Sequence, residues 1–129
     1  YNMLKFWKDK NLFRIFIDAY NNGTILSGVS AGAICWFNYI LTNSLNNRLQ
    51  SSKGLGVINY SCTPHASSEP ERLIIFEQKV KYALMPPGFA IDDGVAVLFI
   101  DGNFSKVFSS RRKHSAYFIT ETGIKNLEE

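Results

Sequence analysis

The five residues at positions 28–32 have the types and spacing that a nucleophilic serine requires. They read Gly28-Val29-Ser30-Ala31-Gly32. A tight strand-to-helix turn lifts a serine hydroxyl clear of a sheet, and small flanking residues let strand and helix come close. The following helix directs free N–H groups at the same point, so the N–H of Ala31 is the expected oxyanion donor. The pattern predicts acyl transfer with Ser30 as nucleophile; the alternative is a glycine-rich turn with a capping serine.

A serine nucleophile needs a base, and the chain has two histidines. His114 lies in a cationic run at 111–114, where neighbouring positive charge disfavours an imidazolium. His65 follows a predicted strand, and parallel-sheet enzymes place working residues at such strand ends. We therefore predict that His65 is the base, against the alternative of a structural or exposed histidine. The acid that orients it stays open among four carboxylates, Glu69, Glu71, Asp92 and Asp93.

Hydrophobic periodicity predicts the elements that must position these residues. Apolar residues at helical spacing predict a helix over 12–20, after an earlier helical turn or two at 3–7. The short apolar run at 24–27 predicts a buried strand directly before the serine, and 33–37 predicts a helix directly after it. Residues 42–54 are rich in Asn and Ser, which predicts a loop.

The second half of the chain predicts one helix among strands. A strand over 56–62 leads to His65, and Ser68 and Glu71 then have the capping-box spacing of a helix that ends before residue 86. Its inward residues are Leu73, Phe76, Val80 and Ala83. Further strands are expected at 89–91, 95–100, 104–109 and 116–120, with a hairpin turn at 101–103. The order predicts a layered α/β fold in which late antiparallel strands extend a parallel sheet.

The totals predict a single domain over residues 1–129, with 46% hydrophobic and 19% charged residues. A net charge of +3 does not call for nucleic acid, and the run at 111–114 is typical of a solvated loop. No apolar run approaches the roughly 20 residues that span a bilayer, and the first residues lack the layout of a signal peptide. Cys35 and Cys62 supply neither a disulfide framework nor a metal quartet. We therefore predict a cytoplasmic protein with no metal, nucleic-acid or membrane partner.

Ordered motifs along the chain resemble the dipeptidase E-like (aspartyl dipeptidase) serine peptidases, particularly a bacterial branch of uncharacterised peptidases. They lie at 28–37, 54–56, 62–65, 68–72 and 90–94, before a late strand pair that ends at 109–111. The resemblance covers nearly the whole chain. It implies a three-layer, parallel-sheet fold like that of class I glutamine amidotransferases (flavodoxin-like), with a C-terminal antiparallel extension. It also implies a Ser30–His65 pair that hydrolyses small peptides without metal or cofactor, N-terminal aspartate dipeptides being the preferred substrates of better-known members.

The same resemblance implies a third catalytic residue and a partner. Relatives of this branch carry an acidic residue near position 43, so Asn43 takes that place here; an amide can orient an imidazole but cannot offset its charge. An acidic substrate needs an arginine, and Arg72 lies nearest in sequence. Because relatives have further strands upstream, including a Gly-Gly-Asn-type turn, we expect the C-terminal two-thirds of a member. We expect it to pair with the missing segment or to form a homodimer; the alternative is a catalytically impaired fragment or pseudoenzyme that serves only folding or interaction.

Overall fold

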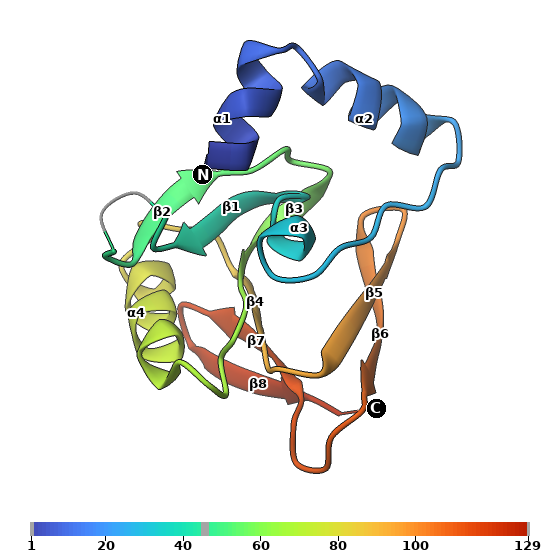
Figure 1. Cartoon of the computed structure of the whole chain (residues 1–129). Coiled ribbons are helices and arrows are strands. Elements are labelled where there is room, and N and C mark those ends of the chain that lie inside the picture. Colours follow the sequence, from blue (N-terminus) through green and yellow to red (C-terminus); the bar gives the residue numbers. More distant parts are fainter. Residues whose placement is uncertain (1, 45–46, 129) are drawn as a thin grey trace.

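The computed structural model describes residues 2–44 and 47–128, which form an α/β fold around a six-stranded mixed sheet (Figure 1). The helices are α1 (Asn2–Asp9), α2 (Phe13–Asn21), α3 (Ala31–Ile34) and α4 (Pro70–Lys81). The strands are β1 (Phe37–Thr42), β2 (Gln50–Lys53), β3 (Ile58–Thr63), β4 (Gly88–Ile91), β5 (Val95–Ile100), β6 (Asn103–Ser109), β7 (Ala116–Thr120) and β8 (Gly123–Leu127). The expected α/β class is thus confirmed.

The main sheet has the strand order β2-β1-β3-β4-β7-β8, and only its centre is parallel. Strands β1, β3 and β4 run in one direction, and α4 makes the crossover between β3 and β4 that parallel pairing requires. The outer strands β2, β7 and β8 pair antiparallel with their neighbours, while β5 and β6 form a separate hairpin. Parallel strands end at the same edge of a sheet, so the loops after β3 and β4 are neighbours.

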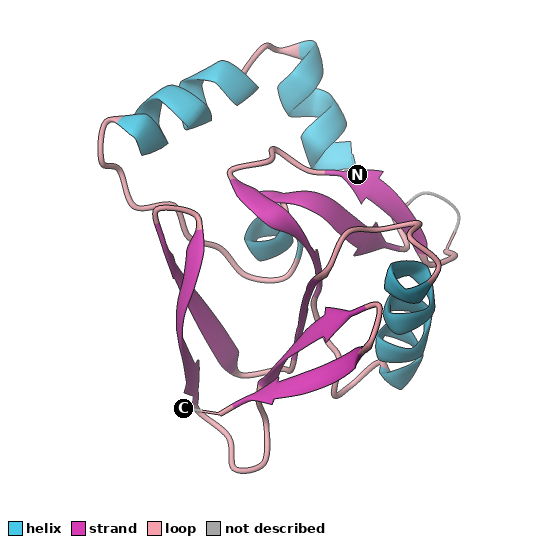
Figure 2. Cartoon of the chain, turned by 180° about the vertical axis from the view of Figure 1, so that it is seen from behind, coloured by secondary structure: helices cyan, strands magenta, loops and turns pink. Residues whose placement is uncertain are grey.

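Each face of the sheet is covered by a different layer. Helix α4 packs against β3, β4 and β7, and its Phe76 and Val80 join Leu41 and Ile119 in one core cluster. The hairpin and α1 contribute Val107 and Leu4 to the other cluster, and Figures 1 and 2 show α4 and the hairpin on opposite sides of the molecule. Of the expected architecture, the layered arrangement is present, but antiparallel strands form half of the sheet.

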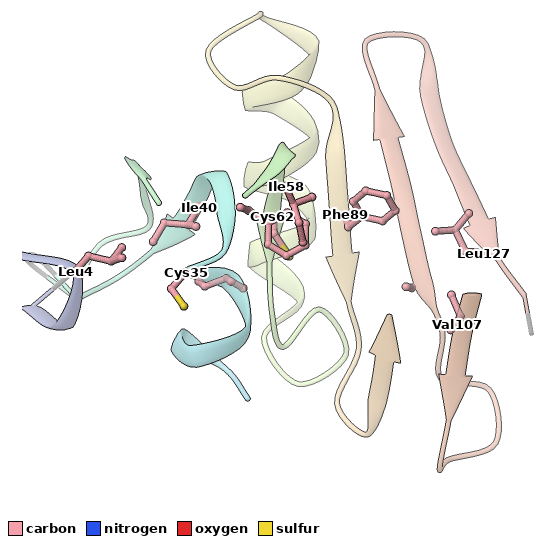
Figure 3. Packing of buried hydrophobic residues seen from close by; sticks show 11 residues of the cluster. Leu4, Cys35, Ile40, Ile58, Cys62, Phe89, Val107 and Leu127 are labelled. Atoms are coloured by element: carbon pink, nitrogen blue, oxygen red, sulfur yellow. The ribbon is translucent and has the colours of Figure 1, made fainter. Parts of the chain in front are cut away.

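Phe89 of β4 is central to the second cluster (Figure 3). It is 2% exposed, and five other rings have centroids 5.0–6.3 Å from its own. They are Phe37, Tyr60, Phe99, Phe104 and Phe118. Rings at these separations are attractive beyond their buried area. They fix β4, and with it the loop that follows β4.

The N-terminal helices attach through a smaller aromatic cluster. The Trp7 ring lies 4.6 Å from Phe16 and 6.3 Å from Trp36, and Phe16 lies 5.8 Å from Trp36. Trp36 stands between α3 and β1, so these contacts tie α1 and α2 to the segment that follows the predicted nucleophile. Within residues 2–44 and 47–128, no helix is long and apolar enough to cross a membrane.

One expectation for the first half of the chain is wrong, and two are right only in part. Residues 24–27 form no strand and Ile25 is 91% exposed, because no strand of the described ranges pairs with them. The helix after Ser30 spans Ala31–Ile34, and the chain then enters β1. The polar stretch 42–54 is not all loop, since it includes β2, whose polar residues suit the edge of a sheet.

Later expectations agree better with the structure. Strands β3 to β7 and helix α4 lie where they were expected, with β5 and β7 matching at both ends, whereas β8 was not expected. The capping box is absent, because the residue before α4 is Glu69 and its side chain makes no capping bond. Phe76 and Val80 are buried as expected, but Ala83 lies beyond the helix and is exposed.

Candidate active site

Ser30 lies on a strained turn directly before α3. Its backbone has φ 53° and ψ −120°, a combination that an L-residue rarely adopts and that a nucleophile elbow requires. Gly28 makes the turn possible, because a Cβ there would lie 2.0 Å from the carbonyl oxygen of Gly32. A Cβ on Gly32 itself would meet no atom within 4 Å. Of the two glycines in the motif, only Gly28 has to be a glycine for steric reasons.

His65 stands within hydrogen-bond distance of Ser30, 35 residues away in the chain. The Oγ atom of Ser30 lies 2.8 Å from Nε2 of His65. His65 comes two residues after the end of β3, and its backbone is also left-handed, with φ 59°. The sequence-predicted nucleophile and base are therefore brought into the geometry that their pairing requires.

Asp93 occupies the other side of the imidazole. Its Oδ1 atom lies 2.6 Å from Nδ1 of His65. Asp93 comes two residues after the end of β4, as His65 comes two residues after β3, and the two strands are parallel neighbours. A carboxylate at Nδ1 holds the proton there and leaves Nε2 as acceptor for the serine hydroxyl. The result is a continuous hydrogen-bonded chain from Ser30 through His65 to Asp93.

Hydrogen bonds keep the Asp93 carboxylate charged. The pKa of Asp93 is lowered from 3.8 to about 2, first by the hydroxyl of Ser68 and then by the imidazole of His65, with Ser67 adding less. The Oγ atom of Ser67 lies 3.2 Å from Oδ2 of Asp93 and also accepts the Asp93 backbone N–H at 3.0 Å. An ionised carboxylate beside the ring is the form that stabilises an imidazolium.

Comparison with known proteins places the chain in a family. The model of "Peptidase family S51" matches residues 1–107. The chain belongs to this family. Over 116 residues, 90% of this chain, it is 38% identical to the "Uncharacterized peptidase YgaJ" of Bacillus subtilis (strain 168). That alignment covers 50% of the relative, so the S51 chain spans about half the length of the curated relative it matches. The resemblance to dipeptidase E-like peptidases is thereby confirmed.

The other candidates for the orienting residue of this S51 site have different partners. The Oδ2 atom of Asp92 accepts the N–H of Ser115 at 3.0 Å, which fixes the start of β7. Glu69 binds Nε of Arg72 at 2.6 Å. Glu71 is exposed in the first turn of α4. Spacing did not separate these acids, whereas the structure sets Asp93 alone among them against His65.

Within the described ranges, no hydrogen bond joins Asn43, the expected third catalytic residue, to His65. Asn43 follows β1 at the same edge of the sheet and is exposed. Both ring nitrogens of His65 already face other partners, Ser30 and Asp93. The geometry therefore favours Asp93 over Asn43 for the orienting position.

Arg72, the expected substrate-binding residue, is turned into the protein. It is 5% exposed, and its guanidinium binds Glu69 and donates from Nη1 to the carbonyl of Leu41 at 3.3 Å. A buried guanidinium with two internal acceptors is not presented to a ligand. In this S51 chain Arg72 instead joins α4 to the end of β1.

Ala31 keeps the expected place of an oxyanion donor. The N–H groups of Gly32, Ala33 and Ile34 bind the carbonyls of Val29 and Ser30. Within the described ranges, the N–H of Ala31 has no backbone acceptor, and Ala31 is exposed. The first N–H of the helix is therefore available beside Ser30.

Sequence reasoning missed two contacts that surround Asp93. Ser67 binds both its backbone and its carboxylate, and Nδ1 of His114 lies 2.9 Å from its carbonyl oxygen. The position of Ser67, two residues after His65, was a usable signal, because a residue that close to the base shares its loop. The contact of His114 carries no such signal, since 21 residues separate it from Asp93.

Proposed function

We propose that this S51 chain carries the nucleophile, the base and the orienting acid of a serine peptidase. The observation that supports it is the continuous chain of two hydrogen bonds, Ser30–His65 at 2.8 Å and His65–Asp93 at 2.6 Å. Its residues come from three separate loops, and the serine backbone is strained. Strain at a residue with this side-chain geometry is typical of catalytic sites.

In the proposed mechanism Ser30 Oγ attacks the carbonyl carbon of a peptide while its proton passes to Nε2 of His65. Asp93 stabilises the imidazolium that forms, and the N–H of Ala31 donates to the oxyanion. Collapse of the tetrahedral intermediate breaks the C–N bond, and His65 returns the proton to the leaving amine. Water then attacks the acyl-enzyme by the same route and releases the acid. No metal or cofactor takes part in these steps.

We propose small peptides as the substrate class, as the resemblance to dipeptidase E-like enzymes suggests, with N-terminal aspartate as the first residue to test. Recognition of that aspartate has to come from a cation other than Arg72, which is buried against Glu69. We also propose a cytoplasmic location, which the two free, buried thiols of Cys35 and Cys62 support. The parallel centre β1-β3-β4 supports a flavodoxin-like sheet, of the kind found in class I glutamine amidotransferases, in the whole enzyme.

Labelling by a serine-directed fluorophosphonate, read by intact mass spectrometry, tests the proposal. We expect one adduct on the parent chain, none on Ser30→Ala and none on His65→Ala, because labelling needs both the nucleophile and its base. Circular dichroism confirms that each variant is folded. A folded parent chain that gains no adduct, or a Ser30→Ala variant that still gains one, contradicts the proposal. A panel of dipeptides then defines the substrate.

A second candidate function is a non-catalytic interaction piece. Ile25 and Val29 both precede Ser30 in the chain and are 91% and 87% exposed, which is a favourable surface for a second copy or for further chain. Sedimentation velocity distinguishes the two functions when it is combined with labelling. A chain that associates and gains no adduct has only the interaction function.

A further inference from the structure

Ser67 makes two bonds to the same residue. Its hydroxyl accepts the backbone N–H of Asp93 at 3.0 Å and donates to the carboxylate oxygen Oδ2 at 3.2 Å. A hydroxyl has one donor and two acceptor positions, so both bonds can form together. One side chain thus joins the main chain of Asp93 to its own carboxylate, which limits rotation of that side chain.

The two carboxylate oxygens of Asp93 have different partners. Oδ2 faces Ser67, and Oδ1 faces Nδ1 of His65 at 2.6 Å. Because Ser67 fixes Oδ2, the remaining oxygen is directed at the imidazole. Ser68 also lowers the pKa of the carboxyl, but within the described ranges only Ser67 binds both the backbone N–H and the carboxylate.

Ser67 also joins two loops that the parallel strands bring together. It lies in the loop after β3, with His65, whereas Asp93 lies in the loop after β4. A backbone bond from the N–H of Ala66 to the carbonyl of Ile91, at 3.1 Å, also joins the loop after β3 to the last residue of β4. That backbone bond already joins the two segments. The separate contribution of the Ser67 hydroxyl is therefore the direction of the Asp93 carboxylate.

We propose that Ser67 is a positioning residue of this site, holding the Asp93 carboxylate so that it fixes the proton-bearing nitrogen of His65. The inference rests on the proposed function for its effect on catalysis, but not for its effect on the imidazole. Within the described ranges, Ser67 makes no hydrogen bond to Ser30 or to the imidazole, so it acts through Asp93.

Nitrogen-15 NMR of the imidazole tests this directly. The chain has only two histidines, so His65→Ala assigns the signals. We expect the parent chain to show His65 with its proton on Nδ1. We expect Ser67→Ala to shift it toward a mixture of the two tautomers. Ser67→Thr keeps a hydroxyl and should restore the parent spectrum, whereas Ser67→Val has the same shape without a hydroxyl and should not. The Thr and Val pair decides the result if Ser67→Ala does not fold.

The rate of fluorophosphonate labelling gives the second readout. We expect Ser67→Ala to slow labelling about 10- to 100-fold, as misplacement of a catalytic group does, and Ser67→Thr to recover it. The control is Ser110→Ala, whose hydroxyl binds the carbonyl of Gly94 at 2.8 Å in the neighbouring turn and does not touch the carboxylate. It should label at the parent rate.

The outcomes separate the two proposals. If Ser67→Ala or Ser67→Val keeps the parent tautomer and labelling rate, Ser67 is not a positioning residue, and the serine peptidase proposal stands. If the parent chain never labels but the tautomer depends on the hydroxyl at position 67, the positioning role stands and the proposed function fails. A parent chain with the His65 proton on Nε2 overturns the positioning role.

Discussion

The two sides of Ser30 are built differently. On one side lie His65 and Asp93, in loops held by the parallel strands β3 and β4 and joined to each other by hydrogen bonds. On the other side lies the segment 24–29, which has no strand partner in the described ranges and exposes Ile25 and Val29. The Oγ atom of Ser30 nevertheless lies 2.8 Å from Nε2 of His65.

This difference teaches that the turn around Ser30 is a local structure. The close approach of Gly28 to Gly32 and the bonds from Ala33 and Ile34 to the carbonyl of Ser30 fix the serine from within seven residues. His65 and Asp93 depend instead on strand pairing across the sheet for their positions. Substitutions in the turn around Ser30 and substitutions near His65 and Asp93 should therefore affect labelling and stability differently.

The largest expected effect is on the labelling rate and concerns Asp93, the proposed orienting acid. Asp93→Asn removes the charge that stabilises the imidazolium and the acceptor that holds the tautomer, so fluorophosphonate labelling should slow by about 10³–10⁴-fold. Asn43→Ala is the matched control at the same sheet edge and should label at the parent rate. Equal losses for both variants would return Asn43 to consideration as the orienting residue.

The second largest effect should be on stability, where a core substitution should cost much more than an exposed one. Phe89→Ala should lower the free energy of unfolding by about 3–5 kcal/mol, because it removes the ring at the centre of the aromatic cluster. Ile25→Ala should change it by less than about 0.5 kcal/mol, because the side chain is exposed. Urea unfolding measures both. A large loss for Ile25→Ala would show that the segment before Ser30 is packed in solution, for example against a second copy.

Substitutions at the two glycines of the turn around Ser30 should change the free energy of unfolding with opposite signs. Gly28→Ala should destabilise the chain by about 1–3 kcal/mol, because its Cβ would overlap the carbonyl of Gly32. Gly32→Ala fills open space in α3 and should stabilise the chain by up to about 1 kcal/mol, since alanine favours helix. Urea unfolding gives the free energies and labelling reports the serine. Equal destabilisation by both substitutions would mean that the close approach is not specific to Gly28.

The smallest effect should appear in acid. Folding lowers the pKa of Asp93 from 3.8 to about 2. Between pH 3.8 and about pH 2, the Asp93 carboxyl therefore binds fewer protons in the folded chain than in the unfolded chain. The stability that this carboxylate contributes is complete above about pH 4 and is lost as pH falls through about 2. Urea midpoints of the parent chain and Asp93→Asn should therefore converge over this range. A difference that is constant from pH 7 to 2 would show that the carboxylate is not stabilised by folding.

Much of the fold follows from local pattern. The runs at 95–100 and 116–120 are rich in β-branched and aromatic residues and predicted β5 and β7, because side chains of these types suit a strand. The prediction of a buried strand at 24–27 was wrong for a related reason. Its composition suits a buried strand, but a strand exists only where another pairs with it, and composition does not reveal the neighbour.

The sequence by itself determined the candidates for the nucleophile and the base. Ser30 is identified by a motif of five consecutive residues, and His65 is one of two histidines, the other lying among cations. Only the tertiary structure decided which carboxylate meets His65. Asp92 and Asp93 are adjacent and chemically identical, yet one binds the N–H of Ser115 and the other His65. Successive residues at a strand end point in different directions, and the register of β4 against β3 selects which of them meets the base.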